Sequence, residues 1–562
     1  MDRATHRLPH RTVTCRMAGS TLWNSYLKTI GICIIFVFAG FGASPLPTEG
    51  AKILLSMTSI INTPSQHIVI SAITEPLVER GHSVTLLAPM NKITKGLTGA
   101  AVTGKKVFAS PRSREELEEI VASLSSLQNH LSKVGPLGVI QTFRDKVSLL
   151  SEGCLALFND TDTLDELRKE KYDLIITMPI EGCDLLLGQY LEVPYVVISP
   201  VRRSFIVTED HFGIPIPSSY VPFTLFLGYT DRMSFKERLT NIFFRYVVMP
   251  TMEYIATYPV QRIKREFNIR PDLSLRQLTA ESKLWLVYSN FAFEFAQPTA
   301  PNWIPIGGIT AKPAKPLPKE LKDFVEGSGD HGIIVFTLGS GVTSLDNKIL
   351  VESIAKVFSE LPQRVLWRYK GAKPRNLGNN TLISDWLPQN DLLGHPKTRM
   401  LIYHGGAAGV YEATSHGVPL LLMPLVADQM TNAARVESKG LGFSIDKNTI
   451  TEEEFRVAVN EILLNPKKVY LYKTNMARAA AIMKDQPVPP RDAVVFWVEH
   501  VLKFGGDHLR LRAADMNFIQ HNSLDILVFL LAISLLEIYF IRWIVCRCCC
   551  SRSKKTTKPK SE

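Results

Sequence analysis

The chain has 562 residues, of which 46% are apolar, and a formal net charge of +11. The apolar content excludes a mainly disordered protein, and the length exceeds the roughly 250 to 300 residues at which one core stops growing, so we expect at least two domains. Residues 1–28 contribute +4 and residues 542–562 contribute +6 of the charge, which leaves about +1 for the rest. The basic residues therefore gather at the two ends and predict no nucleic-acid-binding face.

The N-terminus has the order of a secretory signal peptide. Four arginines and Lys28 come first, an apolar run follows over residues 30–41, and the small residues Gly42, Ala43 and Ser44 end the segment. We assign residues 1–45 to a signal peptide with a long basic n-region. An uncleaved anchor is the alternative, but the run is shorter than the roughly 20 residues that span a bilayer.

A doubly wound sheet is expected to begin soon after the signal peptide. Residues 53–56 form a short apolar run, a helical pattern follows, and the turn Arg80-Gly81-His82 leads into a second run at residues 83–87. This order is that of a βαβ unit, and similar strands are predicted at residues 172–176 and 195–198. We expect an N-terminal Rossmann-like domain over residues 46–300.

Two further features of this first domain have more than one interpretation. Cys154 and Cys183 are the two cysteines of the body, and they are either bonded or two ordinary buried thiols. Residues 205–267 are apolar and rich in aromatic side chains. That stretch is either plain helical core, an acceptor pocket or a surface that touches a bilayer. Its aromatic residues include Phe223, Phe226, Tyr229, Phe243, Phe244 and Tyr246.

A proline-rich segment at residues 311–318 marks the passage into a second domain. Apolar strands are predicted at residues 333–336 and 365–369, with a helix over residues 347–361 between them. We expect a second Rossmann-like domain over residues 301–500.

The second domain contains a strand, a glycine turn and a helix. An apolar run at residues 400–403 stops at His404-Gly405-Gly406, and residues 407–415 read as a helix that Gly417 ends. Glycines let a phosphate approach the backbone, and the first turn of a helix offers unpaired N–H groups at the positive end of its dipole. With His404 as a further donor and Gly406 at the turn, this stretch predicts a phosphate site.

Polar residues around that turn fit the rest of a nucleotide sugar. Asp428 and Gln429 follow the next strand and are spaced to bond sugar hydroxyls, while Glu412 on the helix fits a ribose diol. Trp386 and Gln389 offer a flat face and an amide for uracil. Each residue alone also fits a structural role, since glycines end strands and tryptophans fill cores.

The C-terminus predicts a membrane anchor. A membrane-proximal segment at residues 501–523 leads into an apolar run at residues 524–545, long enough to span a bilayer although it contains Glu537. A buried core helix is the alternative, but the basic tail at residues 546–562 favours a stop-transfer segment with a cytosolic tail. Cys546, Cys548, Cys549 and Cys550 follow the span, where acylation is favoured over metal binding.

As an ordered set, the stretch from Trp386 to Gln429 closely resembles the signature of the UDP-glycosyltransferases, in particular the membrane-bound animal UDP-glucuronosyltransferase type. Similar patterns lie at residues 332–340 (GIIVFTLGS), 365–371 (VLWRYKG) and 484–499 (KDQPVPPRDAVVFWVE), so the resemblance covers roughly residues 51–540. It implies an α/β fold of the GT-B type, in which two doubly wound domains face a cleft. The final Lys558-Pro559-Lys560-Ser561-Glu562 matches the dilysine retrieval pattern of this family and implies the endoplasmic reticulum membrane.

The resemblance also implies a role for each residue of the donor site. The implied contacts are Trp386 to uracil, Gln389 and Glu412 to the uridine, Ser340 and His404 to the diphosphate, and Asp428 and Gln429 to the transferred sugar. Ala408 departs from the family, where Asn or His is frequent, so one side-chain contact to phosphate is missing. The UDP-sugar is a co-substrate, no other cofactor is expected, and no carboxylate cluster predicts a metal.

The resemblance fails where a catalytic base is expected. Counted back from Arg80-Gly81-His82, the family's histidine position holds Gln66, with His67 next to it, and the family's aspartate position holds Met178. One reading has His67 as base with Glu181 or Asp184 orienting it. In another, the acceptors are amines, carboxylates or acidic phenols that need no strong base.

The third reading is a non-catalytic chain that binds a UDP-sugar or a lipophile, or acts as a regulatory partner. For an active enzyme, the resemblance implies inverting transfer of glucuronate or a hexose to a small lipophilic acceptor. The body would be luminal in a single-pass type I protein, and a homo- or hetero-oligomer remains open. The sequons that begin at Asn159 and Asn379 are then candidate glycan sites.

Overall fold

The computed structural model describes residues 50–59, 64–90, 100–113, 115–117, 119, 136–180, 182–204, 207–224, 227–339, 345, 347–425 and 427–552. The predicted signal peptide and the dilysine pattern at residues 558–562 lie outside these ranges. Ser340 and Glu181 of the predicted site also lie outside them.

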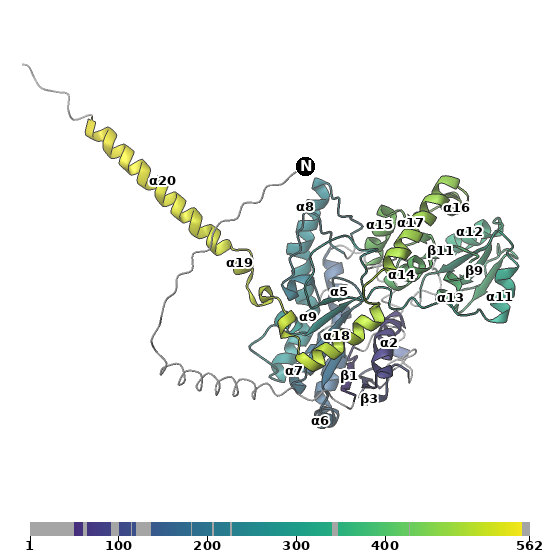
Figure 1. The fold of residues 1–562 in the computed structure, drawn as a ribbon, viewed down its shortest axis with the longest axis horizontal. Helices are drawn as coiled ribbons and strands as arrows, with labels where there is room; N and C mark the ends of the chain where they lie inside the picture. The colour runs from purple at the N-terminus through teal and green to yellow at the C-terminus, as the bar shows by residue number, and fades with distance from the viewer. Residues whose placement is uncertain are drawn as a thin grey trace, which may run out of the picture. The chain divides into compact units, whose positions relative to one another are not determined.

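The first half of the chain forms a seven-stranded sheet in which every neighbouring pair is parallel (Figure 1). Its order is β3-β2-β1-β4-β5-β6-β7. The strands are β1 (Lys52–Ser56), β2 (Ser83–Pro89), β3 (Gly104–Phe108), β4 (Leu174–Thr177), β5 (Tyr195–Ser199), β6 (Leu284–Val287) and β7 (Trp303–Pro305). The central strands are continuous apolar runs because helices cover both faces of a parallel sheet.

Helices connect these strands. They are α2 (Pro64–Glu79), α5 (Pro136–Asn159), α6 (Thr161–Glu170), α7 (Cys183–Leu191) and α10 (Leu275–Ala280). A disulfide joins Cys154 of α5 to Cys183 at the first turn of α7, and both residues are fully buried. The bonded interpretation of these two cysteines is therefore confirmed.

The second half of the aromatic stretch, residues 235–266, forms one continuous run of helix. It consists of α8 (Phe235–Phe243), the π-helical segment η2 (Phe244–Val248) and α9 (Met249–Glu266), and α9 packs on α5. Plain helical core describes this stretch only in part. Phe223 is buried, whereas the side chains of Phe243 and Tyr246 are 54% and 53% exposed.

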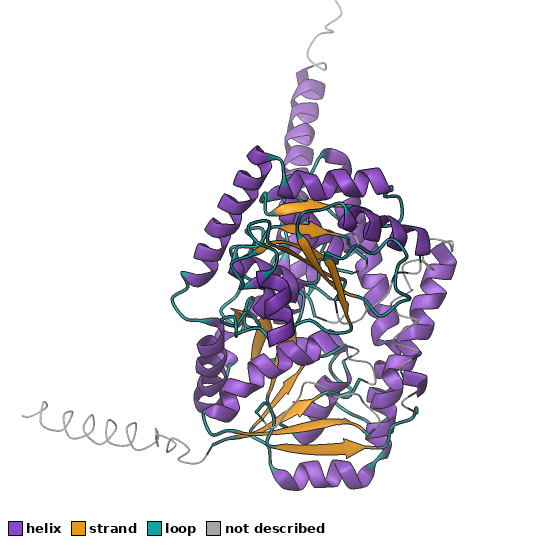
Figure 2. Ribbon diagram, turned by 90° about the vertical axis from the view of Figure 1, so that its right-hand side faces the viewer, coloured by secondary structure: helices purple, strands orange, loops and turns teal. Residues whose placement is uncertain are grey.

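The second half forms a six-stranded sheet, again with parallel neighbours, in the order β10-β9-β8-β11-β12-β13 (Figure 2). The strands are β8 (Ile333–Thr337), β9 (Arg364–Arg368), β10 (Thr381–Ser384), β11 (Thr398–Tyr403), β12 (Leu420–Leu422) and β13 (Gly442–Ser444). Its helices are α11 (Lys319–Glu326), α12 (Lys348–Ser359), α13 (Gln389–Leu393), α14 (Ala407–His416), α15 (Gln429–Ser438), α16 (Glu452–Leu463) and α17 (Pro466–Lys484).

Strand order reverses between β1 and β4 in the first sheet and between β8 and β11 in the second. Open α/β sheets bind ligands outside the carboxyl ends of the strands at such a reversal. Met178 directly follows β4, and His404 directly follows β11. The topology therefore places the predicted base region and the predicted phosphate turn at equivalent points of two sheets.

Side chains of both halves pack against each other. One cluster of buried apolar residues contains members of both sheets, and the Arg435 guanidinium lies 2.6 Å from the Glu294 carboxylate. Helix α18 (Pro490–Phe504) follows the second sheet in sequence but packs on α2 of the first. Arg80 Nε lies 3.1 Å from Glu499 Oε1 at this contact. The segment at residues 484–499, one of those that resemble the family, thus leads back to the first half of the chain.

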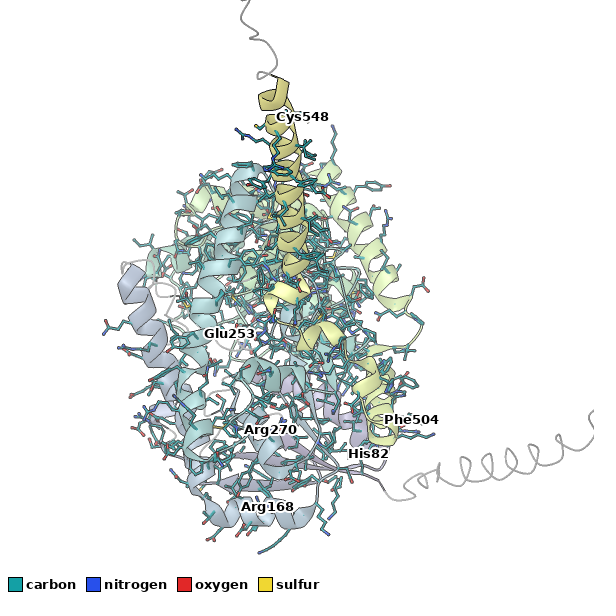
Figure 3. All side chains as sticks on the ribbon, turned by 90° about the vertical axis from the view of Figure 1, so that its left-hand side faces the viewer. His82, Arg168, Glu253, Arg270, Phe504 and Cys548 are labelled. Atoms are coloured by element: carbon teal, nitrogen blue, oxygen red, sulfur yellow. A yellow bond between two sulfur atoms is a disulfide. The ribbon has the colours of Figure 1, made fainter. Side chains whose placement is uncertain are left out.

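The C-terminal helix α20 (Leu524–Arg552) is a candidate membrane span. Within the described part of the chain, it contains the single stretch that is long and apolar enough, at Leu524–Cys548, and none of that stretch is buried against protein. Figure 3 shows Cys548 on this helix, well beyond the end of α18 at Phe504. This helix coincides with the apolar run for which the hydropathy predicted a single-pass anchor.

Candidate active site

The turn between β11 and α14 has a conformation that requires glycine. Gly405 has a φ of +90°, a value that side chains with a Cβ rarely adopt. A Cβ on Gly406 would lie 2.6 Å from His404 Nε2, so the second glycine is required by close packing. Gly406 is the N-cap of α14 and has no side chain to bond the first backbone N–H groups of the helix. The Gly409 N–H donates to the Tyr403 hydroxyl, whereas the N–H groups of Ala407 and Ala408 have no side-chain cap, and an anion at this turn stays a prediction.

His404 lies against this turn in its neutral form. Burial lowers the pKa of the imidazole to about 3, so the ring carries no charge at neutral pH. Its Nδ1 atom is buried and has no hydrogen-bond partner within the described ranges. A Cβ on Gly339 would lie 2.3 Å from His404 Cε1, which places the ring beside the start of the loop that follows β8. A neutral imidazole can donate one N–H to a phosphate oxygen.

Gln389 and Glu412 meet, as expected for residues that hold a uridine. The amide Nε2 of Gln389, at the start of α13, donates to Glu412 Oε2 over 2.7 Å. Burial, with a smaller effect from the charge of Asp391, raises the pKa of Glu412 to about 7. Trp386 lies just before α13 and is 66% exposed. An exposed indole face beside a half-buried amide and a buried carboxyl group provides a stacking platform with polar partners.

The loop between β12 and α15 places Asp428 and Gln429 beside the glycine turn. Ala427 has a φ of +59°, an unfavourable value for a residue with a Cβ, and Asp428 follows as the N-cap of α15. Gln429 accepts a hydrogen bond from the Leu425 N–H over 2.7 Å. Burial raises the pKa of Asp428 to about 6.

Asn432 connects the two loops, a role that the sequence analysis missed. Its Nδ2 atom donates to Asp428 Oδ2 over 2.8 Å and to the Gly405 carbonyl over 2.9 Å. Arg435, one turn further along α15, pairs with Glu294 of the first half. Helical spacing places residues four and seven positions after Asp428 on the same face of α15, and that signal would have identified both.

A cavity of about 300 Å³ adjoins Asp428 between the two halves. From the first half it is lined by Pro200, Val201, Arg202, Thr224, Tyr288 and Glu294, and from the second by Ala407, Tyr411, Asp428, Asn432 and Arg435. The predicted sugar-binding Asp428 thus faces the first domain across a small polar space. Arg202 and Glu294 were not predicted, because only the fold brings them to this place.

The predicted base region differs from the donor side. His67 lies in the first turn of α2 and is 1% exposed, and Gln66 beside it is half-buried. Asp184 is fully buried in the first turn of α7, where it accepts hydrogen bonds from the Ser56 hydroxyl and the Thr58 N–H. Burial raises the pKa of this carboxyl group. Asp184 therefore holds the backbone that follows β1, while buried Met178 occupies the end of β4.

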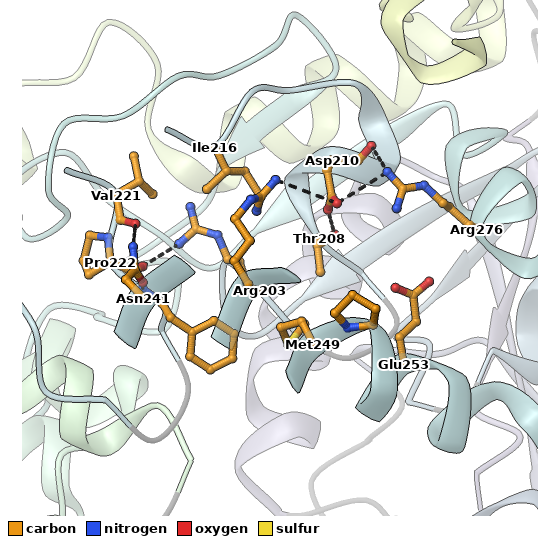
Figure 4. Close-up of a pocket in the computed structure, with 13 residues that line it drawn as sticks. Arg203, Thr208, Asp210, Ile216, Val221, Pro222, Asn241, Met249, Glu253 and Arg276 are labelled. Atoms are coloured by element: carbon orange, nitrogen blue, oxygen red, sulfur yellow. Dashed lines mark hydrogen bonds and ion pairs between the residues drawn. The ribbon is translucent and has the colours of Figure 1, made fainter. Parts of the chain in front are cut away.

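A second and larger cavity lies within the aromatic stretch, about 590 Å³ in volume (Figure 4). Arg203, Asp210 and Arg276 lie on one side of it, and Met249 and Glu253 of α9 lie on the other. Ile216, Val221, Pro222 and Phe223 contribute an apolar wall. The cavity therefore combines an apolar wall with charged groups of both signs.

This cavity adjoins the smaller one through a shared ion pair. Arg203 of the large cavity and Arg202 of the small one both lie within 2.7 Å of the buried Glu209 carboxylate. Neighbouring residues of one loop thus line the two spaces.

Comparisons with known proteins agree with these features. The family described as "UDP-glucoronosyl and UDP-glucosyl transferase" matches residues 54–560. UDP-glucuronosyltransferase 1A6 of Mus musculus is 36% identical over 92% of this chain and 94% of its own length. UDP-glucuronosyltransferase 1A9 of Homo sapiens is 34% identical over 94% of this chain and 95% of its own length.

Solved structures share the fold at low sequence identity. The crystal structure of the glycotransferase of kitacinnamycin is 17% identical and covers 81% of this chain and all of that one, with a TM-score of 0.53. At this level of identity, the likeness shows two facing α/β sheets of the GT-B type and nothing finer.

Proposed function

Because the chain belongs to this family of UDP-glycosyltransferases, we propose that it is an inverting enzyme that transfers glucuronate or a hexose to a small lipophilic acceptor. The observation that carries the proposal is the glycine turn before α14. A helix N-terminus without a side-chain cap, a neutral His404 and the Gln389–Glu412 pair surround one sheet edge. The endoplasmic reticulum membrane, with a luminal body, is the proposed location.

In this proposal, the departing UDP is stabilised without a metal. Negative charge grows on the diphosphate as the bond to the sugar breaks, and the N-terminus of α14 with His404 donates hydrogen bonds to that charge. Trp386 stacks on uracil, and Asp428 and Gln429 bond the sugar hydroxyls. Asn432 keeps Asp428 at the glycine turn, so the sugar and diphosphate contacts move together.

Two mechanisms are considered for the attack by the acceptor group. In the first, His67 takes the proton from an acceptor hydroxyl, with Glu181 or Asp184 orienting it. In the second, amine, carboxylate or acidic phenol acceptors attack without a strong base. The second gains support from Asp184, since its carboxylate already bonds Ser56 and Thr58.

A non-catalytic partner with the same fold is the second candidate function. The observation in its favour is the replacement of both family dyad positions, by Gln66 and by the buried Met178. Such a protein would bind a UDP-sugar or a lipophile and modulate active relatives. Both candidates require UDP binding, so UDP binding alone does not separate them.

Turnover in membranes separates the two candidates. UDP-glucuronate, UDP-glucose, UDP-galactose and UDP-N-acetylglucosamine are each offered with a phenol, an amine and an aliphatic alcohol. We expect product with at least one pair. If no donor and acceptor pair gives product while UDP still binds, the enzyme proposal is wrong and the partner role remains.

His67→Ala separates the two mechanisms. If His67 is the base, this variant loses alcohol conjugation by roughly 100-fold or more and keeps amine conjugation, since general bases contribute about that factor. Gln66→Ala is the matched control on the same turn of α2. Unchanged alcohol turnover in His67→Ala would discard His67 as the base.

A further inference from the structure

The helical run α8–η2–α9 carries a row of exposed apolar side chains along one face. We call this row the apolar stripe, and its members are 44% to 75% exposed. The members are Phe235, Leu239, Ile242, Phe243, Tyr246, Val247, Tyr254 and Tyr258. Single exposed apolar residues are ordinary, but a contiguous row on one element marks a surface that meets a partner or a membrane.

The π-helical segment keeps the stripe on one side. In an uninterrupted α-helix, at about 100° per residue, Tyr254 and Tyr258 would lie roughly 100° and 140° around the axis from Phe235. A π turn contains one residue more than an α turn, which rotates later residues back by about 100° and returns both tyrosines near Phe235. The segment Phe244–Val248 therefore aligns the two halves of the stripe.

Another face of the same helical run lines the larger cavity. Asn241, Arg245, Met249 and Glu253 contribute to that lining, and none of them belongs to the stripe (Figure 4). The run thus separates a cavity with an apolar wall from an exposed apolar surface. Only the thickness of one helix lies between the two.

The charge of the run matches a lipid surface. Arg245 and Glu253 of residues 235–266 line the cavity and Lys264 is buried, and the rest of the run has four Lys or Arg and two Glu, a net charge of +2. Amphipathic helices that lie in the membrane interface combine a basic polar face with aromatic and aliphatic side chains on the other. The same chain also contains the candidate membrane span in α20, which would hold the body of the protein near a bilayer. Tethering raises the effective concentration of the lipid surface without any new contact.

We propose that the apolar stripe lies in the lipid–water interface of the membrane that α20 crosses, with its side chains among the lipid headgroups and upper acyl chains. The body of the protein is then held to the bilayer at two places. The larger cavity lies one helix away from the lipid, where apolar acceptors dissolve and concentrate.

The test uses the full-length chain in vesicles of phosphatidylcholine and phosphatidylserine. All unpaired cysteines are replaced by serine, and one cysteine that carries an environment-sensitive fluorophore is introduced at Leu239 or Tyr254. Matched controls are Val457 of α16 and Ile349 of α12, which are 56% and 80% exposed but lie outside the stripe. Nitroxide-labelled phosphatidylcholine then reports which labels contact lipid.

We expect a blue-shifted emission and strong quenching by the nitroxide lipid at Leu239 and Tyr254, with neither effect at Val457 and Ile349. Equal behaviour of all four labels would overturn the proposal. A blue shift without lipid quenching would also overturn it, because that result means a second protein copy covers the stripe.

A second measurement rests on the proposed transferase activity, whereas the quenching does not. The double variant L239E/Y254E removes two apolar contacts from an exposed face. We expect roughly a tenfold rise in KM for an acceptor that partitions into the bilayer, the factor that about 1.4 kcal/mol produces. KM for a water-soluble acceptor, and activity in detergent micelles, should not change. An unchanged KM for the bilayer-partitioning acceptor would overturn the inference that the stripe serves acceptor capture.

Discussion

The carboxyl ends of β11 and β4 occupy equivalent positions, each at the point where strand order reverses, yet they carry different chemistry. After β11 come a glycine turn and a neutral histidine whose Nδ1 is unbonded within the described ranges. After β4 comes buried Met178, and the nearby Asp184 is bonded to Ser56 and Thr58. The edge after β11 therefore carries a histidine with a nitrogen that is unbonded within the described part of the chain. At the edge after β4, the Asp184 carboxyl group bonds the segment that follows β1.

The comparison teaches that a shared fold does not preserve a site. Parallel sheets place strand ends at a common edge whatever the side chains are, so the position of a site follows from topology. Its chemistry depends on which side chains stand at those strand ends. The donor edge carries the polar residues of the predicted donor site, whereas Gln66 and Met178 replace the family residues at the acceptor edge.

The largest expected effect lies at the donor edge. His404→Ala and Asp428→Ala should each reduce kcat/KM by roughly 100-fold to 1000-fold, because each removes a hydrogen bond to charge that develops in the transition state or to the sugar. Initial rates in membranes, normalised to protein amount, provide the measurement. His331→Ala, an exposed histidine before β8, is the control. A fully active His404→Ala would contradict the proposed phosphate site.

Restoring the family residues at the acceptor edge tests whether their replacement removed the catalytic base. The double variant Q66H/M178D places a histidine and a carboxylate at the two family dyad positions and should raise alcohol conjugation by roughly 10-fold or more, since a general base contributes about 100-fold to 10,000-fold. Q66H/M178L is the matched control and lacks the carboxylate.

Met178→Asp alone should lower thermal stability, because it buries a carboxylate without its partner. If Q66H/M178D folds with wild-type stability but alcohol turnover stays flat, this edge is not where the acceptor loses its proton.

Substitution of Trp386 tests the predicted uridine site, and we expect a smaller effect, on the affinity for UDP. Trp386→Ala should weaken UDP binding by roughly 10-fold, since stacking of a base on an aromatic ring is worth about 1 to 3 kcal/mol. Trp386→Phe should keep most of the affinity because it retains an aromatic face. Calorimetric titration with UDP measures both, and equal affinity in all three proteins would remove Trp386 from the site.

A last effect concerns the pH dependence of stability and not activity. The pKa of Glu412 is raised from 4.5 to about 7 by burial, so the folded state binds this proton more tightly than the unfolded state. Its contribution to stability is therefore greatest below about pH 4.5 and is lost as pH rises toward about 7, by roughly 3 kcal/mol. Thermal melts at about pH 5 and about pH 8 should show a smaller difference for Glu412→Gln than for the parent. An equal difference would refute this role of Glu412.

Local patterns predicted most of the fold because they depend on neighbours in sequence. The apolar runs at β1, β8 and β11 were recognised as buried strands, and the glycine turn after Tyr403 was expected to begin a helix. The resemblance over residues 51–540 agrees with the family match over residues 54–560. The domain boundaries and the individual site residues stay predictions.

Contacts between distant segments could not be predicted in this way. The return of α18 to α2, the Arg435–Glu294 pair and the partners of Asp184 join residues more than 100 positions apart. No periodicity in a single segment specifies such pairs.

By itself, the sequence determined that this is an α/β protein with a UDP-sugar signature, a candidate C-terminal membrane span and an altered base region. Strand, turn and helix signals are local, and so is the order of a signature. Only the tertiary structure decided that Gln389 meets Glu412, that Asn432 connects Asp428 to the glycine turn, and that the aromatic stretch divides into an exposed stripe and a cavity wall. Burial and pairing depend on which surfaces the folded chain brings together, and that is a property of the whole sheet and helix assembly.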